Sequence, residues 1–153
     1  MNRSNCYKTI YILEMVTRPF AHVIKLLQNA GLRPTRQRIG LAHLLFDDNN
    51  RHITAEELHA EAKAAGIPTS LATIYNTLNQ FTASGLLREV IVEPGRTYFD
   101  TNTTGHYHFF LEETGEITDI QESEIAIASL PSLPYGTSVR RIDVVVRITK
   151  SKV

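Results

Sequence analysis

The sequence is poor in cysteine, lacks tryptophan and carries no excess of charge of either sign. Its single thiol, Cys6, excludes a disulfide framework and a zinc site built from several thiolates. No stretch approaches the roughly 18 consecutive apolar residues of a membrane-spanning helix, so we expect no membrane partner. Glu14 interrupts the apolar cluster near the start, which argues against a secretory signal. The 153 residues, 42% of them hydrophobic, suffice for one domain or for two small ones.

Charge is distributed unevenly along the chain although the total is zero. Residues 1–85 carry nine Lys and Arg against six Asp and Glu, and residues 86–153 carry seven against ten. This asymmetry favours a first half that attracts a polyanion and a second half with a different role.

Capping residues and apolar periodicity predict four helices in the first half. The third begins with Thr54 and Glu57, which have the spacing of a capping box. A turn of only three residues, Ile67-Pro68-Thr69, separates it from the fourth helix, and two helices joined so closely form a helix-turn-helix. The expected start and end residues are Thr17 and Gly31, Pro34 and Asp47, Thr54 and Gly66, and Ser70 and Gly85.

After Gly85 the apolar period changes from 3.6 to 2, which is typical of strands. Residues 87–92 and 96–99 flank Glu93-Pro94-Gly95, a hairpin turn, and a helix-turn-helix followed by a hairpin is the order of a winged helix. Further strands are predicted over residues 106–111, 116–120 and 142–148. The last of them places four apolar residues on one face: Ile142, Val144, Val146 and Ile148.

The fourth predicted helix lies in a stretch without a charged residue, from Ala64 to Leu87. One side of it is apolar and the other carries hydroxyl and amide groups, which read base edges and bind phosphate oxygens. Burial against another domain would also explain an uncharged helix, but its place as the second helix of a helix-turn-helix favours DNA. The expected buried side holds Leu71, Ile74, Leu78 and Phe81 with Tyr75 at its edge, and the other side Ala72, Thr73, Asn76, Thr77 and Gln80. Four arginines upstream would attract phosphates: Arg33, Arg36, Arg38 and Arg51.

A second candidate site lies at His106-Tyr107-His108 on a predicted strand. Residues i and i+2 of a strand point to the same face, so the two imidazoles can share one metal ion, or they can be surface histidines without a ligand. Asp100 would add an oxygen donor and His52 a fourth ligand from the DNA-binding half. A site that draws on both halves would couple ligand binding to their relative orientation, as a sensor requires. The common metalloprotease, nucleophile-elbow, phosphate-loop and dinucleotide motifs are absent, so no enzyme is predicted.

Motifs in a fixed order and spacing make the chain similar to the ferric uptake regulator family over residues 20–120. They are Leu32–Arg38, His52–Leu58, Ser70–Phe81, Gly85–Leu87, Gly95–Asp100 and His106–His108. Three further segments resemble the iron response regulator branch of this family. They are residues 97–102, the shortened acidic linker after His108 and residues 141–147. Members of that branch are bacterial repressors or activators of iron and haem genes, and several respond to haem rather than to free iron.

The resemblance implies an α+β fold, with a winged-helix DNA-binding domain over 18–101 and an α/β dimerisation and sensing domain over 102–153. Residues 1–17 form an N-terminal extension outside the resemblance, and we expect residues 1–14 either to be disordered or not to be translated, with synthesis starting at Met15. The resemblance also implies that Tyr75 contacts bases and that Arg33 contacts phosphates or the minor groove. The expected DNA-binding residues are Arg33, Arg36, Arg38, Ser70, Thr73, Tyr75 and Asn76. The expected ligands of a regulatory metal are His52, Asp100, His106 and His108, and haem would use His106 or His108 instead.

Two departures from the family pattern concern metal sites. The C-x-x-C zinc anchor of the family would fall at Leu111 and Thr114, so we expect no structural cysteine-bound zinc. A further His/Asp site would fall at Gly105 and Tyr107, which leaves a single regulatory site. The second domain must then gain its stability from apolar strand faces and from dimerisation.

We therefore expect a cytoplasmic homodimer that binds an A·T-rich, two-fold related DNA operator and regulates iron or haem genes, controlled by Fe²⁺, Mn²⁺ or Zn²⁺ or by haem. Asn76 stands where the family usually has Arg, which indicates an operator different from the iron box, and Cys6 precedes Tyr7 rather than the Pro of a Cys-Pro haem motif. The alternatives are a manganese, zinc or peroxide sensor of the same family, and a metal- or haem-handling protein without a regulatory role.

Overall fold

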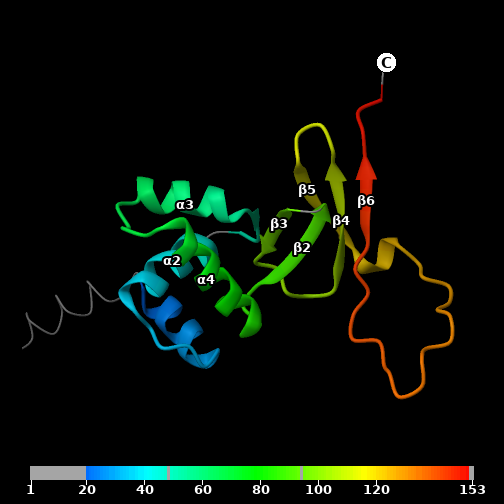
Figure 1. Ribbon diagram of the computed structural model, residues 1–153, viewed down its shortest axis with the longest axis horizontal. Coiled ribbons are helices and arrows are strands. Elements are labelled where there is room, and N and C mark those ends of the chain that lie inside the picture. The colour runs from blue at the N-terminus through cyan, green and yellow to red at the C-terminus, as the bar shows by residue number, and fades with distance from the viewer. Residues whose placement is uncertain (1–19, 48, 94, 152–153) are drawn as a thin grey trace, which may run out of the picture. The chain divides into compact units, whose positions relative to one another are not determined.

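The computed structural model describes residues 20–47, 49–93 and 95–151. The chain divides into two compact units, one up to Thr103 and one from Thr104 onward (Figure 1). The expectations for the extension over 1–17, with Cys6 and Thr17, and for Pro94 lie outside the described residues.

The three labelled helices of the first unit begin where the sequence predicts. After a helix whose described residues are 20–29 come α2 (Arg36–Phe46), α3 (Ala55–Ala64) and α4 (Leu71–Ala83) (Figure 1). Each labelled helix is capped by a side-chain oxygen that accepts the backbone N–H three residues later, from Thr35, Thr54 and Ser70. The predicted capping box of Thr54 and Glu57 is confirmed.

A three-stranded antiparallel sheet completes the first unit, in the order β1-β3-β2. The predicted hairpin is present as β2 (Arg88–Glu93) and β3 (Arg96–Asp100), and its turn includes Gly95 at φ +81°, a conformation that favours glycine. The strand β1 (His52–Ile53) was not expected from the sequence, because two residues carry no periodic pattern. It pairs His52 with Asp100 and Ile53 with Phe99.

The core of the first unit forms where the helices and β3 meet. One correction concerns Thr77, which was predicted on the exposed side of α4 and is buried. It lies three residues after Ile74 and four before Phe81, so packing against the other helices covers a wider stripe of α4 than its apolar residues alone define. The core comprises Val23, Leu27, Leu41, Ala42, Leu45, Ile53, Ala55, Leu58, Ala62, Ile74, Leu78, Phe81, Leu87 and Phe99.

The second unit contains a sheet in the order β5-β4-β6. The strands β4 (His106–Leu111) and β5 (Glu116–Gln121) form an antiparallel hairpin, and a 3-10 helix, η1 (Glu122–Glu124), follows. The last strand, β6 (Val145–Ile148), runs parallel to β4 and is shorter than the predicted 142–148.

The connection from η1 to β6 contains no crossover helix. Parallel strands are usually joined by a helical crossover. Here residues 125–144 contain no helix or strand, and η1 is the only helix in the described part of this unit. Pro131, Pro134 and Gly136, which has φ +77°, interrupt any helical period in this segment. Every helix in the described part of the chain is too short or too polar to span a lipid bilayer.

Candidate functional site

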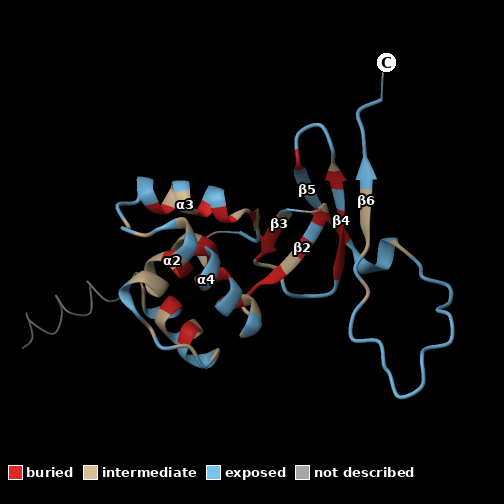
Figure 2. Cartoon of the chain, viewed as in Figure 1, coloured by how far each residue is buried: buried red, intermediate tan, exposed pale blue. Residues whose placement is uncertain are grey.

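The exposed face of α4 is uncharged and polar, as the sequence predicts. Exposed residues recur along it at helical spacing, while the opposite face is buried (Figure 2). They are Ala72, Asn76, Asn79 and Ala83. Of the other predicted DNA-binding residues on this helix, Thr73 is half-buried and hydrogen-bonds the Ser70 hydroxyl, 2.9 Å away. Ser70 thus both caps α4 and lies exposed at its start.

Tyr75 extends from α4 to the preceding helix. Its side chain is 39% exposed, and its hydroxyl donates a hydrogen bond of 2.7 Å to Oε1 of Glu56, in the first turn of α3. This hydrogen bond, with burial and the negative charge of Glu56 as smaller causes, raises the pKa of the Tyr75 phenol above its ordinary value. The phenol is therefore neutral at physiological pH, with its proton directed at Glu56.

Three of the four arginines that were expected near DNA lie beside the helix-turn-helix. Arg33 and Arg36 are exposed, before and at the start of α2. Arg38 is half-buried: its guanidinium donates to Gln80 Oε1 through Nη2 at 2.6 Å and Nε at 3.1 Å, and to the Arg33 carbonyl at 2.9 Å. Arg38 thereby ties α2, α4 and the Arg33 segment into one surface.

Arg51 is engaged inside the first unit instead of facing a phosphate. Its two terminal nitrogens form a bidentate ion pair with Glu61 of α3, at 2.5 and 3.1 Å. Its backbone N–H donates to Thr101 Oγ1 at 2.9 Å, and the Thr101 N–H donates to the Arg51 carbonyl at 3.1 Å. These bonds continue the β1–β3 pairing by one residue, next to His52 and Asp100.

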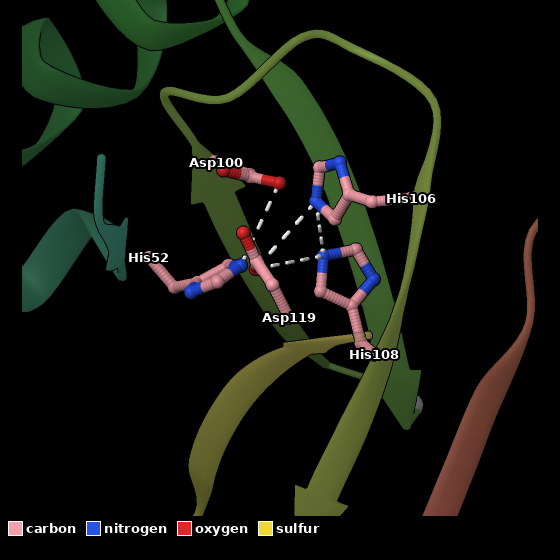
Figure 3. Close-up of side chains that lie close together, drawn as sticks. All are labelled: His52, Asp100, His106, His108 and Asp119. Carbon is pink, nitrogen blue, oxygen red and sulfur yellow. Dashed lines mark hydrogen bonds and ion pairs between the residues drawn. The ribbon is translucent and has the colours of Figure 1, made fainter. Parts of the chain in front are cut away.

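His52 and Asp100 form the candidate ligand pair of the first unit. The β1–β3 register places them opposite each other, with His52 Nε2 3.5 Å from Asp100 Oδ2. The other oxygen of this buried carboxylate accepts the Asn102 N–H at 2.8 Å. Asp100 is thus oriented so that one oxygen faces the His52 imidazole (Figure 3).

The second unit holds a larger group of possible ligands. His106 and His108 share a face of β4, as predicted, and their Nε2 atoms are 2.9 Å apart. Asp119 Oδ1 lies 3.6 Å from His106 Nε2 and 3.9 Å from His108 Nε2, and Figure 3 shows the three groups pointing toward one another. Each residue offers a ligand atom, and these atoms lie within 4.8 Å of one another.

The protonation of His106 suits a metal ligand. Its Nδ1 is 2.9 Å from the Thr104 carbonyl, which only accepts, so Nδ1 carries the proton and Nε2 of a neutral ring presents a lone pair. Such a hydrogen bond from the distal nitrogen is the usual support of a metal-bound imidazole. His106 and His108 are both buried, which makes their proximity to a carboxylate a built feature of β4 and β5.

Asp119 was missed by sequence reasoning. It occupies β5, where it pairs directly with His108 of β4. The sequence signal was the hairpin itself: a turn centred on residues 112–115 sets a register in which a carboxylate on β5 faces the histidine pair.

Comparison with known proteins agrees with this combination of a helix-turn-helix and His/Asp groups. Residues 29–144 match the ferric uptake regulator family. The chain belongs to this family. The ferric uptake regulation protein of Pseudomonas aeruginosa is 33% identical over 100 residues, which cover 65% of this chain and 75% of that protein. The peroxide-responsive repressor PerR of Staphylococcus aureus is 33% identical over 114 residues, covering 74% and 76%.

Solved structures of the ferric uptake regulator family share the fold. The Pseudomonas aeruginosa regulator, in a structure with manganese, gives a TM-score of 0.65 at 27% identity and covers 84% of this chain and 97% of its own. The Vibrio cholerae regulator gives 0.66 at 26% identity, covering 83% and 98%. The expected fold class, a winged-helix domain followed by a dimerisation domain, is confirmed, and the chain is a metal-responsive transcription regulator and not an enzyme.

The donors of both groups suit the metal ions of this family. All are imidazole nitrogens or carboxylate oxygens, which bind Fe²⁺, Mn²⁺ and Zn²⁺. Ligand atoms at about 2.1 Å from one ion lie about 3–3.5 Å from each other. The spacings of 2.9 to 3.9 Å within the second group are close to this range, so the residues present fit a metal ion.

The place of the family's zinc anchor is a polar turn in this chain. Leu111 ends β4 and Thr114 lies in the following turn, which the Gly115 N–H closes by donating to the Leu111 carbonyl at 2.8 Å. Ion pairing of Glu112 with Arg147 at 3.2 Å ties this turn to β6. At the second family site, a Cβ on Gly105 would lie 2.7 Å from a Glu122 carboxylate oxygen, so a larger side chain there would displace Glu122.

Proposed function

We propose that this protein is a homodimeric repressor or activator of iron and haem genes, of the iron response regulator type, that acts on DNA in the cytoplasm. The observation that carries the proposal is that each unit gathers His and Asp side chains, without any thiolate, and that three of them, Asp100, His106 and His108, are buried. Membership of the ferric uptake regulator family supports its DNA-binding and metal-sensing parts.

The proposed regulatory site combines the ligands of both units on one metal ion. His52 and Asp100 offer two donors, and His106, His108 and Asp119 offer three. Neither group alone supplies the four ligands that Zn²⁺ takes or the larger number that Mn²⁺ accepts. One ion held by both groups would fix the orientation of the DNA-binding unit on the dimerisation unit, and so the spacing of two recognition helices in a dimer.

DNA contacts are proposed for the helix-turn-helix surface of the first unit. The neutral face of α4 would enter the major groove of an A·T-rich site, and the nearby arginines would bind its phosphates. The residues proposed for these contacts are Arg33, Arg36, Arg38, Ser70, Thr73, Tyr75 and Asn76.

Dimerisation is proposed through the face of the second sheet that lies opposite the histidines. Phe109 and Ile148 are each 38% exposed in the single chain although they belong to adjacent strands. Val146 pairs with Phe109 and is half-buried, and Val144 follows the same alternation. A second copy that covers this apolar face would give the dimer that is characteristic of the family.

A metal ion suits the histidine pair better than haem does. The two Nε2 atoms are 2.9 Å apart, so each ring blocks the ligand atom of the other, and the pair would have to separate before either ring could bind a haem iron. Haem would then act by displacing the metal. Bound metal would favour DNA binding, whereas bound haem would release the DNA.

The deciding experiment uses the full chain after metal removal, reconstituted with Fe²⁺ under anaerobic conditions, Mn²⁺, Zn²⁺, haem or nothing. Binding to a duplex selected from random DNA by the metal-loaded protein is measured by fluorescence anisotropy. Metal should raise affinity, and haem should lower it. Failure of every form to select a sequence would contradict the regulatory proposal. Metal-dependent binding that haem leaves unchanged would favour the manganese, zinc or peroxide alternatives.

Three variants locate the sites. Tyr75→Ala should cost about 1–3 kcal/mol of specific affinity, the usual contribution of a good base contact. Arg33→Ala should lower affinity for all duplexes and reduce the slope of the salt dependence by about 1.

The double variant His106→Ala/His108→Ala should lose the spectral change with haem, the response to metal and the release of DNA, while it stays folded. Haem binding that survives in this variant would place the haem site elsewhere in the chain.

A further inference from the structure

Glu56 is an unusual neighbour for a DNA-reading surface. It is exposed in the first turn of α3, and its partner within the described residues is the Tyr75 hydroxyl, 2.7 Å away. The helix that carries Tyr75 has no charged residue at all. The carboxylate therefore places a negative charge at the edge of an otherwise neutral face.

That charge opposes DNA binding of any sequence. Phosphate charges repel a carboxylate over about 8 Å at physiological ionic strength. The N-terminus of α3 stabilises the Glu56 carboxylate but does not remove its field. Glu56 thus adds nothing to general DNA affinity, and its contribution lies in what it does to Tyr75.

The hydrogen bond decides what Tyr75 can offer to a base. A phenol has one proton and two lone pairs. Because the Tyr75 O–H donates its hydrogen bond to Glu56, Tyr75 presents to a base only its apolar ring and the lone pairs of its hydroxyl oxygen, which accept hydrogen bonds. A thymine methyl group fits the ring, and the amino groups of adenine and cytosine fit the acceptor. Guanine O6 and N7 are acceptors in the major groove and meet no donor there.

We propose that Glu56 is a specificity-determining residue: by holding the Tyr75 proton, it makes the recognition helix discriminate against guanine at the base pair that Tyr75 contacts. The inference rests on the proposed DNA-binding function. It adds to it the reason for an acidic residue at this place and the direction of the base preference. A phenol released from Glu56 would donate to guanine or to a phosphate and lose that preference.

Two conservative variants separate the hydrogen bond from the charge. Glu56→Gln keeps an acceptor oxygen at the same reach and removes the charge. Glu56→Asp keeps the charge and is one methylene too short to hold the bond. The probe is the Mn²⁺-loaded full chain with its selected duplex and all single-base variants of that duplex. The positions that Tyr75 reads are those where Tyr75→Ala changes the base preference.

At those positions, discrimination against guanine should fall about fivefold in Glu56→Asp and in Glu56→Ala, the equivalent of one neutral hydrogen bond. Glu56→Gln should keep it within about twofold and bind unrelated DNA more tightly than the wild type. Phenylalanine has no proton to redirect, so the double variant Glu56→Ala/Tyr75→Phe should regain the discrimination that Glu56→Ala loses. Glu116→Gln, which removes an exposed carboxylate from β5, is the charge control and should change no preference.

If Glu56→Asp and Glu56→Ala still discriminate against guanine as the wild type does, and Tyr75→Ala changes the base preference, the role of Glu56 is overturned. The proposed Tyr75 contact would then stand. An unaltered preference in Tyr75→Ala would overturn the proposed Tyr75 contact and the inference with it. Thermal unfolding of each variant checks that the helix-turn-helix stays folded.

Discussion

Hydrogen bonds from neighbouring groups orient the reactive side chains of both candidate sites. The Thr104 carbonyl accepts a hydrogen bond from Nδ1–H of His106 and leaves Nε2 as the ligand atom. Glu56 accepts a hydrogen bond from the Tyr75 hydroxyl, so that the ring and an oxygen lone pair of Tyr75 are left to contact a base. In each case a fixed acceptor selects one tautomer of the imidazole or one rotor position of the hydroxyl. This lowers the conformational-entropy cost of binding a ligand.

Asp119→Ala tests the ligand that local sequence patterns did not reveal. Loss of the carboxylate opposite His108 should weaken Mn²⁺ binding by about tenfold or more, because even outer partners of metal ligands contribute that much. Titration against a competing chelator measures the change. Thr118→Ala is the matched control, since this neighbour on β5 pairs with Phe109 and faces the other side of the sheet. Equal Mn²⁺ affinity in the two variants would exclude Asp119 from the site.

The Tyr75 phenol should titrate above the ordinary pKa of a tyrosine. Its pKa is raised because Glu56 accepts a hydrogen bond from the protonated form, so the bond stabilises the fold below pH 10 and is lost as pH rises through the Tyr75 pKa. In Glu56→Ala the pKa of Tyr75 should return toward about 10. The ¹³Cζ shift of labelled tyrosine, assigned with Tyr75→Phe, follows this titration. A Tyr75 curve that is unchanged by Glu56→Ala would refute the assignment of cause.

At the scale of elements, structure could be predicted where local signals and packing agree. The capping box of Thr54 and Glu57 marks the start of α3, and β4 has the predicted bounds, His106 to Leu111. Both elements have a distinctive local pattern, either a cap or a period of 2. Four of the five possible metal ligands were found in the same way, from the spacing of histidines on a strand and from the family motifs.

What the sequence did not reveal depends on contacts between distant segments. β1 is only two residues long and exists because it pairs with β3. Asp119 becomes a candidate ligand through the β4–β5 register, and Thr77 is buried because neighbouring helices cover the edge of the apolar stripe of α4. Each of these features follows from tertiary packing, which a local pattern does not contain.

Thr54→Ala should lower the free energy of unfolding by about 1 kcal/mol, within the range of 0.5–2 for lost N-caps. The reason is that Thr54 accepts the Glu57 N–H, one of the amides at the start of α3 that has no partner within the helix. Urea unfolding followed by circular dichroism measures the loss. Glu57→Gln is the matched control, because glutamine retains the reciprocal bond of the capping box. A loss below about 0.3 kcal/mol would show that α3 is held by packing alone.

At the scale of the whole molecule, the second unit needs a partner. It spans residues 104–153, fewer than the roughly 70 that usually supply a sufficient core, and among the described residues it buries few hydrophobic side chains, Tyr107, Phe110 and Ile120. It lacks the cysteines that would anchor a structural zinc. Its sheet leaves Phe109 and Ile148 partly exposed. Pairing with a second copy would cover this face and replace the stabilisation that zinc provides elsewhere.

The dimer should therefore survive removal of metal, although operator binding should not. Chelation with EDTA is expected to abolish specific DNA binding by releasing the ion from the His/Asp ligands, while sedimentation velocity still shows a dimer. Val146→Lys should instead yield monomers, because it places an ammonium group on the apolar face beside Phe109. Thr149→Lys, which adds the same charge just beyond β6, is the control and should remain dimeric. Monomers that appear on chelation alone would show that metal, not the apolar sheet face, holds the two copies together.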